Sequence, residues 1–160
     1  MIEIACAAAE DAVTLAEIMK KAWCSAFRGI LSDDVIAQYT QPKDCGAMFS
    51  RILASGEGTM YLAKSEDVPM GLLYWLEEGD ALKIEALLTV PEAWGCGIGP
   101  ALMEKAVSDA VALGKNCIRV WPFEQNARAR RFYEKRGFVS TGAQRMSDAL
   151  ELEYVRDLGR

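Results

Sequence analysis

The chain has 160 residues, 51% of them hydrophobic and 26% charged, and its formal net charge is −5. This length and composition predict one globular domain over residues 1–160, large enough to bury a core without metal or disulfide cross-links. The negative charge argues against non-specific binding to nucleic acid or to an anionic membrane, and therefore favours a small ligand.

The residues usually used for metal binding and nucleophilic catalysis are scarce. The sequence contains five scattered cysteines without a C-x-x-C pair, and it has no histidine. A disulfide framework, a zinc site and every nucleophile that depends on histidine are thereby disfavoured, so we expect no metal. Since the N-terminus lacks a signal-peptide pattern and no apolar run is long enough to span a bilayer, we expect a cytoplasmic protein without membrane contact.

The first third of the chain predicts a strand and three helices. Residues 2–6 form a short apolar strand, and apolar residues then repeat at helical spacing. Ser32 is expected to cap a second helix that ends at Pro42, and a third helix is expected over residues 44–56. The residues expected on the buried sides of these two helices are Val35, Ile36, Tyr39, Met48, Ile52 and Leu53.

The middle of the chain has the alternation of strands. Three strands are predicted at residues 59–64, 70–77 and 81–90, with turns rich in Glu, Asp, Gly and Pro between them, which indicates an antiparallel meander. Pro100 suits the first turn of the helix that follows, and Gly114 ends that helix.

The last third predicts a strand at residues 116–121, a helix capped by Asn126, and a hairpin of residues 138–142 and 150–158. Because a helix joins the strands near 84 and 118, these two strands should be parallel within an otherwise antiparallel sheet. The predicted fold class is therefore α/β (α+β), with a mixed, mostly antiparallel sheet of six or seven strands flanked by helices.

A glycine-rich turn lies between the strand that ends near Val90 and the helix at Pro100. Glycines at 95, 97 and 99 allow a tight backbone turn whose N–H groups point inward, and the helix start adds unpaired N–H groups. Such a loop can bind phosphate. It lacks the Gly-Lys-Ser/Thr of a Walker loop and the G-x-G-x-x-G spacing of a Rossmann loop, so the alternative from the loop alone is a simple strand-to-helix turn.

Two ordered motifs resemble the GCN5-related N-acetyltransferase (GNAT) family. The family loop, Gln/Arg-x-x-Gly-x-Gly/Ala, matches residues 94–99 except that Trp94 stands at its first position. A second family motif matches almost without gaps at Asn126, Ala129, Phe132, Tyr133, Glu134, Lys135, Gly137 and Phe138. Residues 22–31 also look like the opening helices of a common subgroup, so the resemblance covers essentially the whole chain.

The resemblance implies a fold in which the two parallel strands splay apart and acetyl-CoA binds between them. Pantetheine would add to the strand at Leu88, Thr89 and Val90, with the Leu88 N–H as donor to the thioester oxygen. The residues expected to cradle the pyrophosphate are Gly95, Cys96, Gly97, Ile98, Gly99 and Pro100. Trp94 and Pro100 weaken this cradle, because the first removes polar side-chain contacts and the second has no N–H.

The reaction implied is direct attack of an amine on acetyl-CoA, with Tyr133 as the acid that protonates the leaving thiolate. Asn126 is expected both to touch the cofactor and to cap its helix. Glu85, Glu124 and a chain of waters are the candidates for the base, and Glu85 is preferred. A basic run at 128–136 could meet the 3′-phosphate or could simply face solvent.

The acceptor is expected to be the primary amine of a small molecule or peptide. Trp23, Phe27, Trp75 and the loop at 143–147 are expected to line its site. The carboxylates expected to attract its charge are Glu77, Glu78, Asp80 and Glu85. A non-catalytic acyl-CoA-binding module and a nucleotide-binding protein are the alternatives, although Tyr133 disfavours the first and the missing Walker lysine the second. Monomer and homodimer are both left open.

Overall fold

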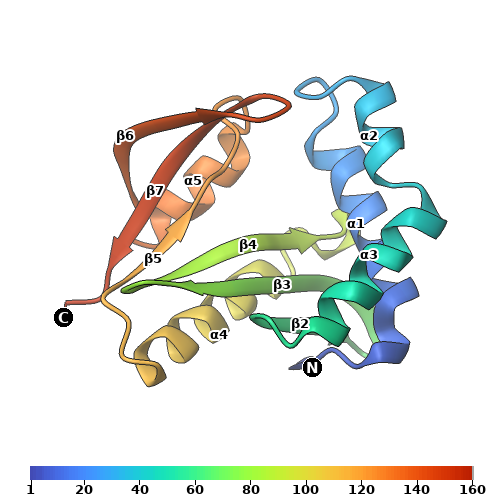
Figure 1. Cartoon of the computed structure of the whole chain (residues 1–160), viewed down its shortest axis with the longest axis horizontal. Helices are drawn as coiled ribbons and strands as arrows, with labels where there is room; N and C mark the ends of the chain where they lie inside the picture. The colour runs from blue at the N-terminus through green and yellow to red at the C-terminus, as the bar shows by residue number, and fades with distance from the viewer. Residues whose placement is uncertain (160) are drawn as a thin grey trace.

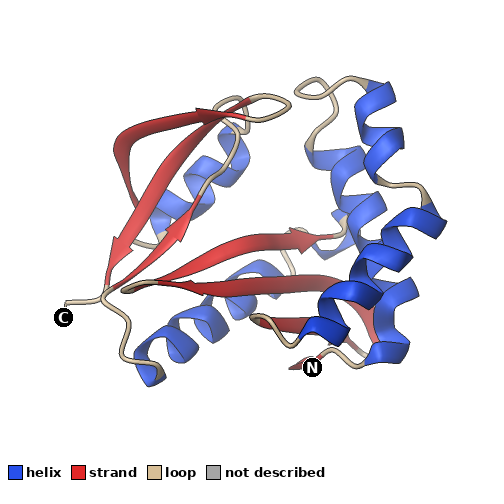
Figure 2. Ribbon diagram, in the orientation of Figure 1, coloured by secondary structure: helices blue, strands red, loops and turns tan. Residues whose placement is uncertain are grey.

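The computed structural model describes residues 1–159, which form one mixed sheet of seven strands in the order β1-β2-β3-β4-β5-β7-β6 (Figures 1 and 2). The strands are β1 (Ile2–Cys6), β2 (Thr59–Ser65), β3 (Val68–Glu78), β4 (Ala81–Thr89), β5 (Cys117–Val120), β6 (Val139–Met146) and β7 (Leu150–Asp157). The helices are α1 (Ala12–Ala26), α2 (Asp33–Tyr39), α3 (Pro42–Ser55), α4 (Ile98–Ala112) and α5 (Ala127–Lys135). The predicted fold class is confirmed.

Among the described strands, β4 and β5 are the one parallel pair. Their pairing covers three positions, from Ala81 opposite Cys117 to Lys83 opposite Arg119, and it stops there. Beyond this point the two strands diverge, as Figure 1 shows, and β5 continues beside β7 while β4 stays beside β3. We call the opening between the diverging strands the fork. It leaves the β4 edge at residues 84–89 without a neighbouring strand.

Two helical layers cover the β1–β4 half of the sheet, and the alternation of β3 shows which residues face each layer. Trp75 is buried and donates its indole N–H to Asp109 of α4 over 3.0 Å. The neighbouring Tyr74 points the other way, into a cavity that is also lined by α1 and α3. Gly71 lies so close to α4 that a Cβ atom there would stand 3.0 Å from Ile98 and 2.9 Å from the Leu88 carbonyl oxygen.

Several element boundaries and faces differ from the sequence prediction. Helix α3 begins at Pro42, because proline is well suited to a first helical position, and α4 begins at Ile98 behind Gly97 as its N-cap. Tyr39 is 43% exposed, although it was expected to be buried. Strand β6 extends to Met146 and so takes in most of the expected loop at 143–147. Within residues 1–159, no helix has the length and apolarity needed to cross a membrane.

Candidate active site

A cavity of about 870 Å³ opens at the fork, between α1, α3, β4, the glycine loop and α5. Most of the predicted site residues line it, although they come from three separate segments of the sequence. The predicted residues that line the cavity are Glu85, Leu88, Thr89, Gly95, Gly97, Gly99, Pro100, Asn126 and Tyr133.

Three predicted site residues do not line this cavity. Val90 is 3% exposed and donates its N–H to the Met70 carbonyl oxygen over 3.0 Å. Ile98 is fully buried in the core below the loop. Cys96 is exposed, and its N–H is bound to the Ala93 carbonyl oxygen at 3.0 Å. Ile98 is nevertheless the first residue of α4, so its backbone N–H belongs to the first turn of that helix.

The register of β4 changes the assignment of the backbone donors at the fork. In an antiparallel pair, hydrogen-bonded residues alternate with residues whose N–H groups point away from the partner strand. Val90 bonds to Met70 of β3, and Leu88 stands opposite Leu72 two residues earlier, so Leu88 also points its N–H at β3. The expectation that the Leu88 N–H faces the ligand is therefore corrected.

The N–H groups that point into the fork belong to Leu87 and Thr89, which alternate with Leu88 along the strand. Both residues line the cavity. The register below them is interrupted because Tyr74 stands opposite Ala86 while Trp75 stands opposite Ile84. Glu85 is thus the extra residue of a β-bulge, a feature that re-aims side chains at the edge of a site.

The glycine loop provides a smaller set of donors than its sequence suggests. The Trp94 N–H binds the Pro91 carbonyl oxygen at 3.1 Å, and the Cys96 N–H is used as described above. Gly95 and Gly97 have φ of +80° and +87°, conformations that glycine adopts without strain. Within the described residues, the N–H groups of Gly95, Gly97 and Gly99 are not used by comparable backbone bonds, so they remain available to an anion.

Trp94 has an unexpected partner. The guanidinium carbon of Arg128, in the first turn of α5, lies 3.3 Å from the centre of the Trp94 ring, and both residues line the cavity. Burial and the nearby Arg131 lower the pKa of Arg128, but a guanidinium stays charged in proteins. The family motif suggested a loss of polar contacts at Trp94, whereas the structure places a cation against its ring. The local sequence gave no signal for this contact, because the two residues are far apart in the chain.

Tyr133 reaches the cavity from α5 and is 6% exposed. Its ring packs edge-on against Phe132 and Phe138, with both pairs of ring centres 5.4 Å apart. Within residues 1–159, its hydroxyl has no side-chain or backbone hydrogen-bond partner. Burial raises the pKa of this phenol, so Tyr133 holds its proton throughout the neutral range. It can therefore act as a proton donor to a group placed beside it.

The other residues of α5 divide into structural and available groups. Asn126 caps the helix, since its Oδ1 accepts a bond from the Ala129 N–H over 3.1 Å. Arg130 donates to the Tyr154 hydroxyl and to the Glu124 carbonyl oxygen, and it does not line the cavity. Arg136 stacks on the Phe132 ring. The basic residues of α5 and its C-cap that line the cavity are Arg128, Arg131, Lys135 and Arg136.

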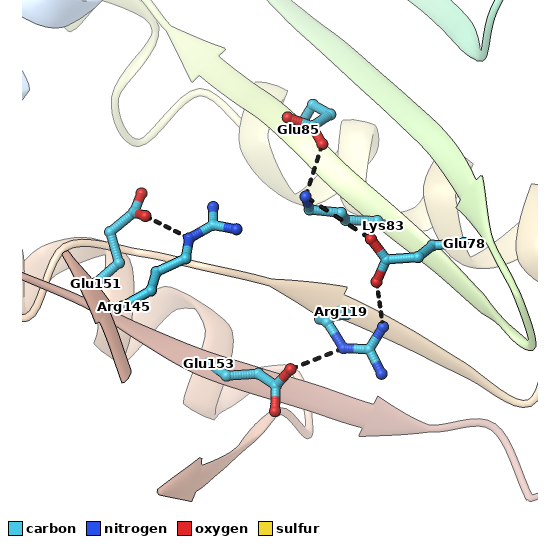
Figure 3. Close-up of polar contacts among 7 residues, drawn as sticks. All are labelled: Glu78, Lys83, Glu85, Arg119, Arg145, Glu151 and Glu153. Carbon is cyan, nitrogen blue, oxygen red and sulfur yellow. Dashed lines mark hydrogen bonds and ion pairs between the residues drawn. The ribbon is translucent and has the colours of Figure 1, made fainter. Parts of the chain in front are cut away.

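Glu85 belongs to a chain of ion pairs at the base of the fork, drawn in Figure 3. Its carboxylate lies 3.0 Å from the Lys83 ammonium. Arg119 continues the chain, because it lies 2.6 Å from Glu78 of β3 and 2.8 Å from Glu153 of β7. The Lys83 ammonium also lies 3.8 Å from Glu78, so these contacts connect β3, β4, β5 and β7 where the parallel pairing ends. Glu124, the alternative base, is exposed and does not line the cavity.

Only some of the residues expected at the acceptor site line the cavity. Trp23, Phe27 and Glu85 line the cavity, whereas Trp75 faces α4 on the opposite side of the sheet. Glu77 and Glu78 form ion pairs with Lys115 and Arg119 and lie outside the cavity. Neither Asp80 nor residues 143–147 line it. The lining residues that the sequence analysis did not assign to a ligand site include Met48, Ile52, Tyr74, Leu87, Phe123 and Glu151.

Comparison with known proteins decides the family. The model of the acetyltransferase (GNAT) family matches residues 17–138, which include β4, the glycine loop and Tyr133. The chain belongs to the GNAT family. It is an N-acetyltransferase that uses acetyl-CoA. Among residues 1–159 there is no group of three or more His, Cys, Asp or Glu side chains that could hold a metal ion.

Named relatives agree with this assignment. Peptidyl-lysine N-acetyltransferase YjaB of Escherichia coli is 37% identical over 106 residues, which are 62% of this chain and 66% of YjaB. An uncharacterized N-acetyltransferase of Archaeoglobus fulgidus is 30% identical over 59% of this chain and 69% of its own. Among solved structures, the PaiA N-acetyltransferase of Thermoplasma acidophilum, in complex with coenzyme A, superposes with a TM-score of 0.82 at 20% identity, covering 98% of this chain and 99% of that one.

Proposed function

We propose that this GNAT enzyme transfers the acetyl group from acetyl-CoA to a primary amine by direct attack, and that the fork is where the transfer takes place. The observation that carries the proposal is the open edge of β4, where the N–H groups of Leu87 and Thr89 face the same cavity as the Tyr133 ring. An extended pantetheine chain could pair with this edge as an added strand.

The cofactor end of the cavity suits a highly charged anion. The N–H groups of Gly95, Gly97 and Gly99 and the N-terminus of α4 would hold the pyrophosphate. Arg128, fixed against Trp94, supplies a cation at the side of this loop, where the family motif usually has Gln or Arg. Asn126 holds the first turn of α5 in place, so that Arg128 and Tyr133 keep their positions.

The chemistry follows from these positions. The amine nitrogen attacks the thioester carbon, and the Leu87 N–H is placed to stabilise the negative charge that develops on the oxygen. The C–S bond then breaks, the thiolate takes the Tyr133 proton, and the proton of the attacking nitrogen leaves to a base. Glu85 is our candidate for that base, directly or through water, because it is the bulged residue of β4 and lines the cavity. No step uses Cys96 or an acyl-enzyme.

The experiment that tests this proposal is an assay of thiol release with acetyl-CoA and a panel of primary amines, in which mass spectrometry identifies the acetylated product. We expect the product to be an N-acetyl amide and the protein to stay unacetylated. Binding of acetyl-CoA without transfer to any amine would instead support the non-catalytic module.

A further inference from the structure

The acceptor end of the cavity is built from aromatic and aliphatic side chains. We use the term acceptor end for the part lined by Trp23, Phe27, Met48, Ile52, Tyr74 and Phe123. Phe27 packs edge-on against Trp23, with ring centres 5.1 Å apart, and against Phe123 on the other side, at 5.0 Å. Because Trp23 and Phe27 come from the α1 region and Phe123 from the loop after β5, this row of rings bridges both sides of the fork.

The carboxylates of the cavity are already paired. Its only acidic lining residues within the described chain are Glu85 and Glu151. Glu85 lies 3.0 Å from the Lys83 ammonium, and Glu151 lies 2.5 Å from the Arg145 guanidinium, contacts that Figure 3 draws. The cations that line the cavity, Arg128, Arg131, Lys135 and Arg136, belong to α5 or to its C-cap. A substrate with several positive charges would therefore find no unpaired carboxylate along the wall of the cavity.

We propose that the acceptor is a primary amine carried on an apolar, aromatic body, rather than a polyamine or a lysine side chain among other charged groups. This inference rests on the proposed function and specifies its substrate. Aromatic rings prefer the edge-on and offset contacts that Trp23, Phe27 and Phe123 can offer to a further ring. The amino group would then be the one polar group of the substrate, and it would lie toward Glu85 and the fork.

Apolar walls also help the chemistry. Desolvation disfavours the charged form of an amine and so lowers the pKa of a bound ammonium, which raises the fraction of the neutral nucleophile. This matters in an enzyme without histidine whose preferred base, Glu85, already faces a lysine. A hydrophobic acceptor gains binding free energy by contact with the same apolar surface, whereas a strongly hydrated acceptor would have to give up its bound water there at a cost in free energy.

The test compares 2-phenylethylamine, spermidine and a short neutral peptide with one lysine, each with saturating acetyl-CoA. We expect kcat/KM for 2-phenylethylamine to exceed the other two by tenfold or more. A preference for spermidine or for the peptide would overturn the inference and leave the acetyltransferase function intact. Transfer to none of the three, with acetyl-CoA bound, would count against the proposed function itself.

Variants locate the effect. Phe27→Ala and Phe123→Ala should raise KM for 2-phenylethylamine at least fivefold, while the Kd for acetyl-CoA stays unchanged. Phe27→Leu keeps an apolar side chain without a ring, and it is included in case Phe27→Ala does not fold. Tyr39→Ala is the matched control, because Tyr39 contacts Trp23 at 5.6 Å between ring centres but does not line the cavity. Equal KM values in all four variants would contradict the inference.

Discussion

Replacing Tyr133 by phenylalanine removes the hydroxyl and keeps the ring, so this variant distinguishes the contribution of each group. The ring is held by Phe132 and Phe138, and the hydroxyl has no hydrogen-bond partner among residues 1–159, so phenylalanine fits the same space. Phenylalanine therefore loses no hydrogen bond within the protein, and we expect the free energy of unfolding to change by less than about 1 kcal/mol. Acetyl-CoA affinity should also be kept.

The rate should change instead. Loss of a positioned acid lowers turnover by roughly ten- to a thousand-fold, which corresponds to about 1.4 to 4 kcal/mol in the barrier. Because burial raises the Tyr133 pKa, its acid form persists above the ordinary value of about 10, and the wild-type rate should show no alkaline decline from this group below that pH. Steady-state kinetics with Tyr39→Phe as control measure both effects. A Tyr133→Phe enzyme with the wild-type rate would refute the assignment and leave Tyr133 a packing residue.

Three further substitutions test other parts of the structure. Arg128→Ala should weaken acetyl-CoA binding, measured by calorimetry, about tenfold or more, since hydrogen bonds to charged groups contribute about 1.5 to 3 kcal/mol. The control is Arg51→Ala, which removes an exposed arginine outside the cavity and should leave the affinity unchanged; equal affinities in both variants would mean that Arg128 only covers Trp94. Pro100→Ala restores an N–H to the first turn of α4, so this variant should bind acetyl-CoA several-fold more tightly and should have a slightly lower melting temperature without ligand. Weaker or equal binding would mean that position 100 points away from the phosphates. Asp109→Ala removes the carboxylate that accepts hydrogen bonds from the Tyr61 hydroxyl at 2.5 Å and from the Trp75 indole N–H at 3.0 Å, so chemical denaturation should show that the free energy of unfolding falls by on the order of 2 to 5 kcal/mol. An unchanged denaturation midpoint would show that water replaces the carboxylate.

The sequence could predict features that depend on local chemistry. Ser32 and Asn126 cap their helices as expected, because a side-chain oxygen three residues before a free N–H needs no tertiary context. The parallel pair also followed from local reasoning, since a strand, a helix and a second strand in one sheet have a preferred arrangement.

Features that depend on register or on distant packing could not be predicted. One hydrogen bond, from Val90 to Met70, decides which β4 N–H groups face the fork, and nothing in the β4 sequence distinguishes Leu87 from Leu88. Trp75 was expected at the acceptor site, yet its place in the alternation of β3 turns it toward Asp109. The contact between Arg128 and Trp94 depends on how α5 lies against the glycine loop.

The central claim is that the open edge of β4 binds the acyl donor, and amide hydrogen exchange by NMR tests it most directly. Without ligand, the Leu88 amide should exchange slowly, because it is bonded to β3, while the Leu87 and Thr89 amides should exchange quickly. Adding coenzyme A should protect Leu87 and Thr89 and leave Leu88 unchanged. Protection confined to Leu88, or no change at any of the three amides with saturating ligand, would contradict the account.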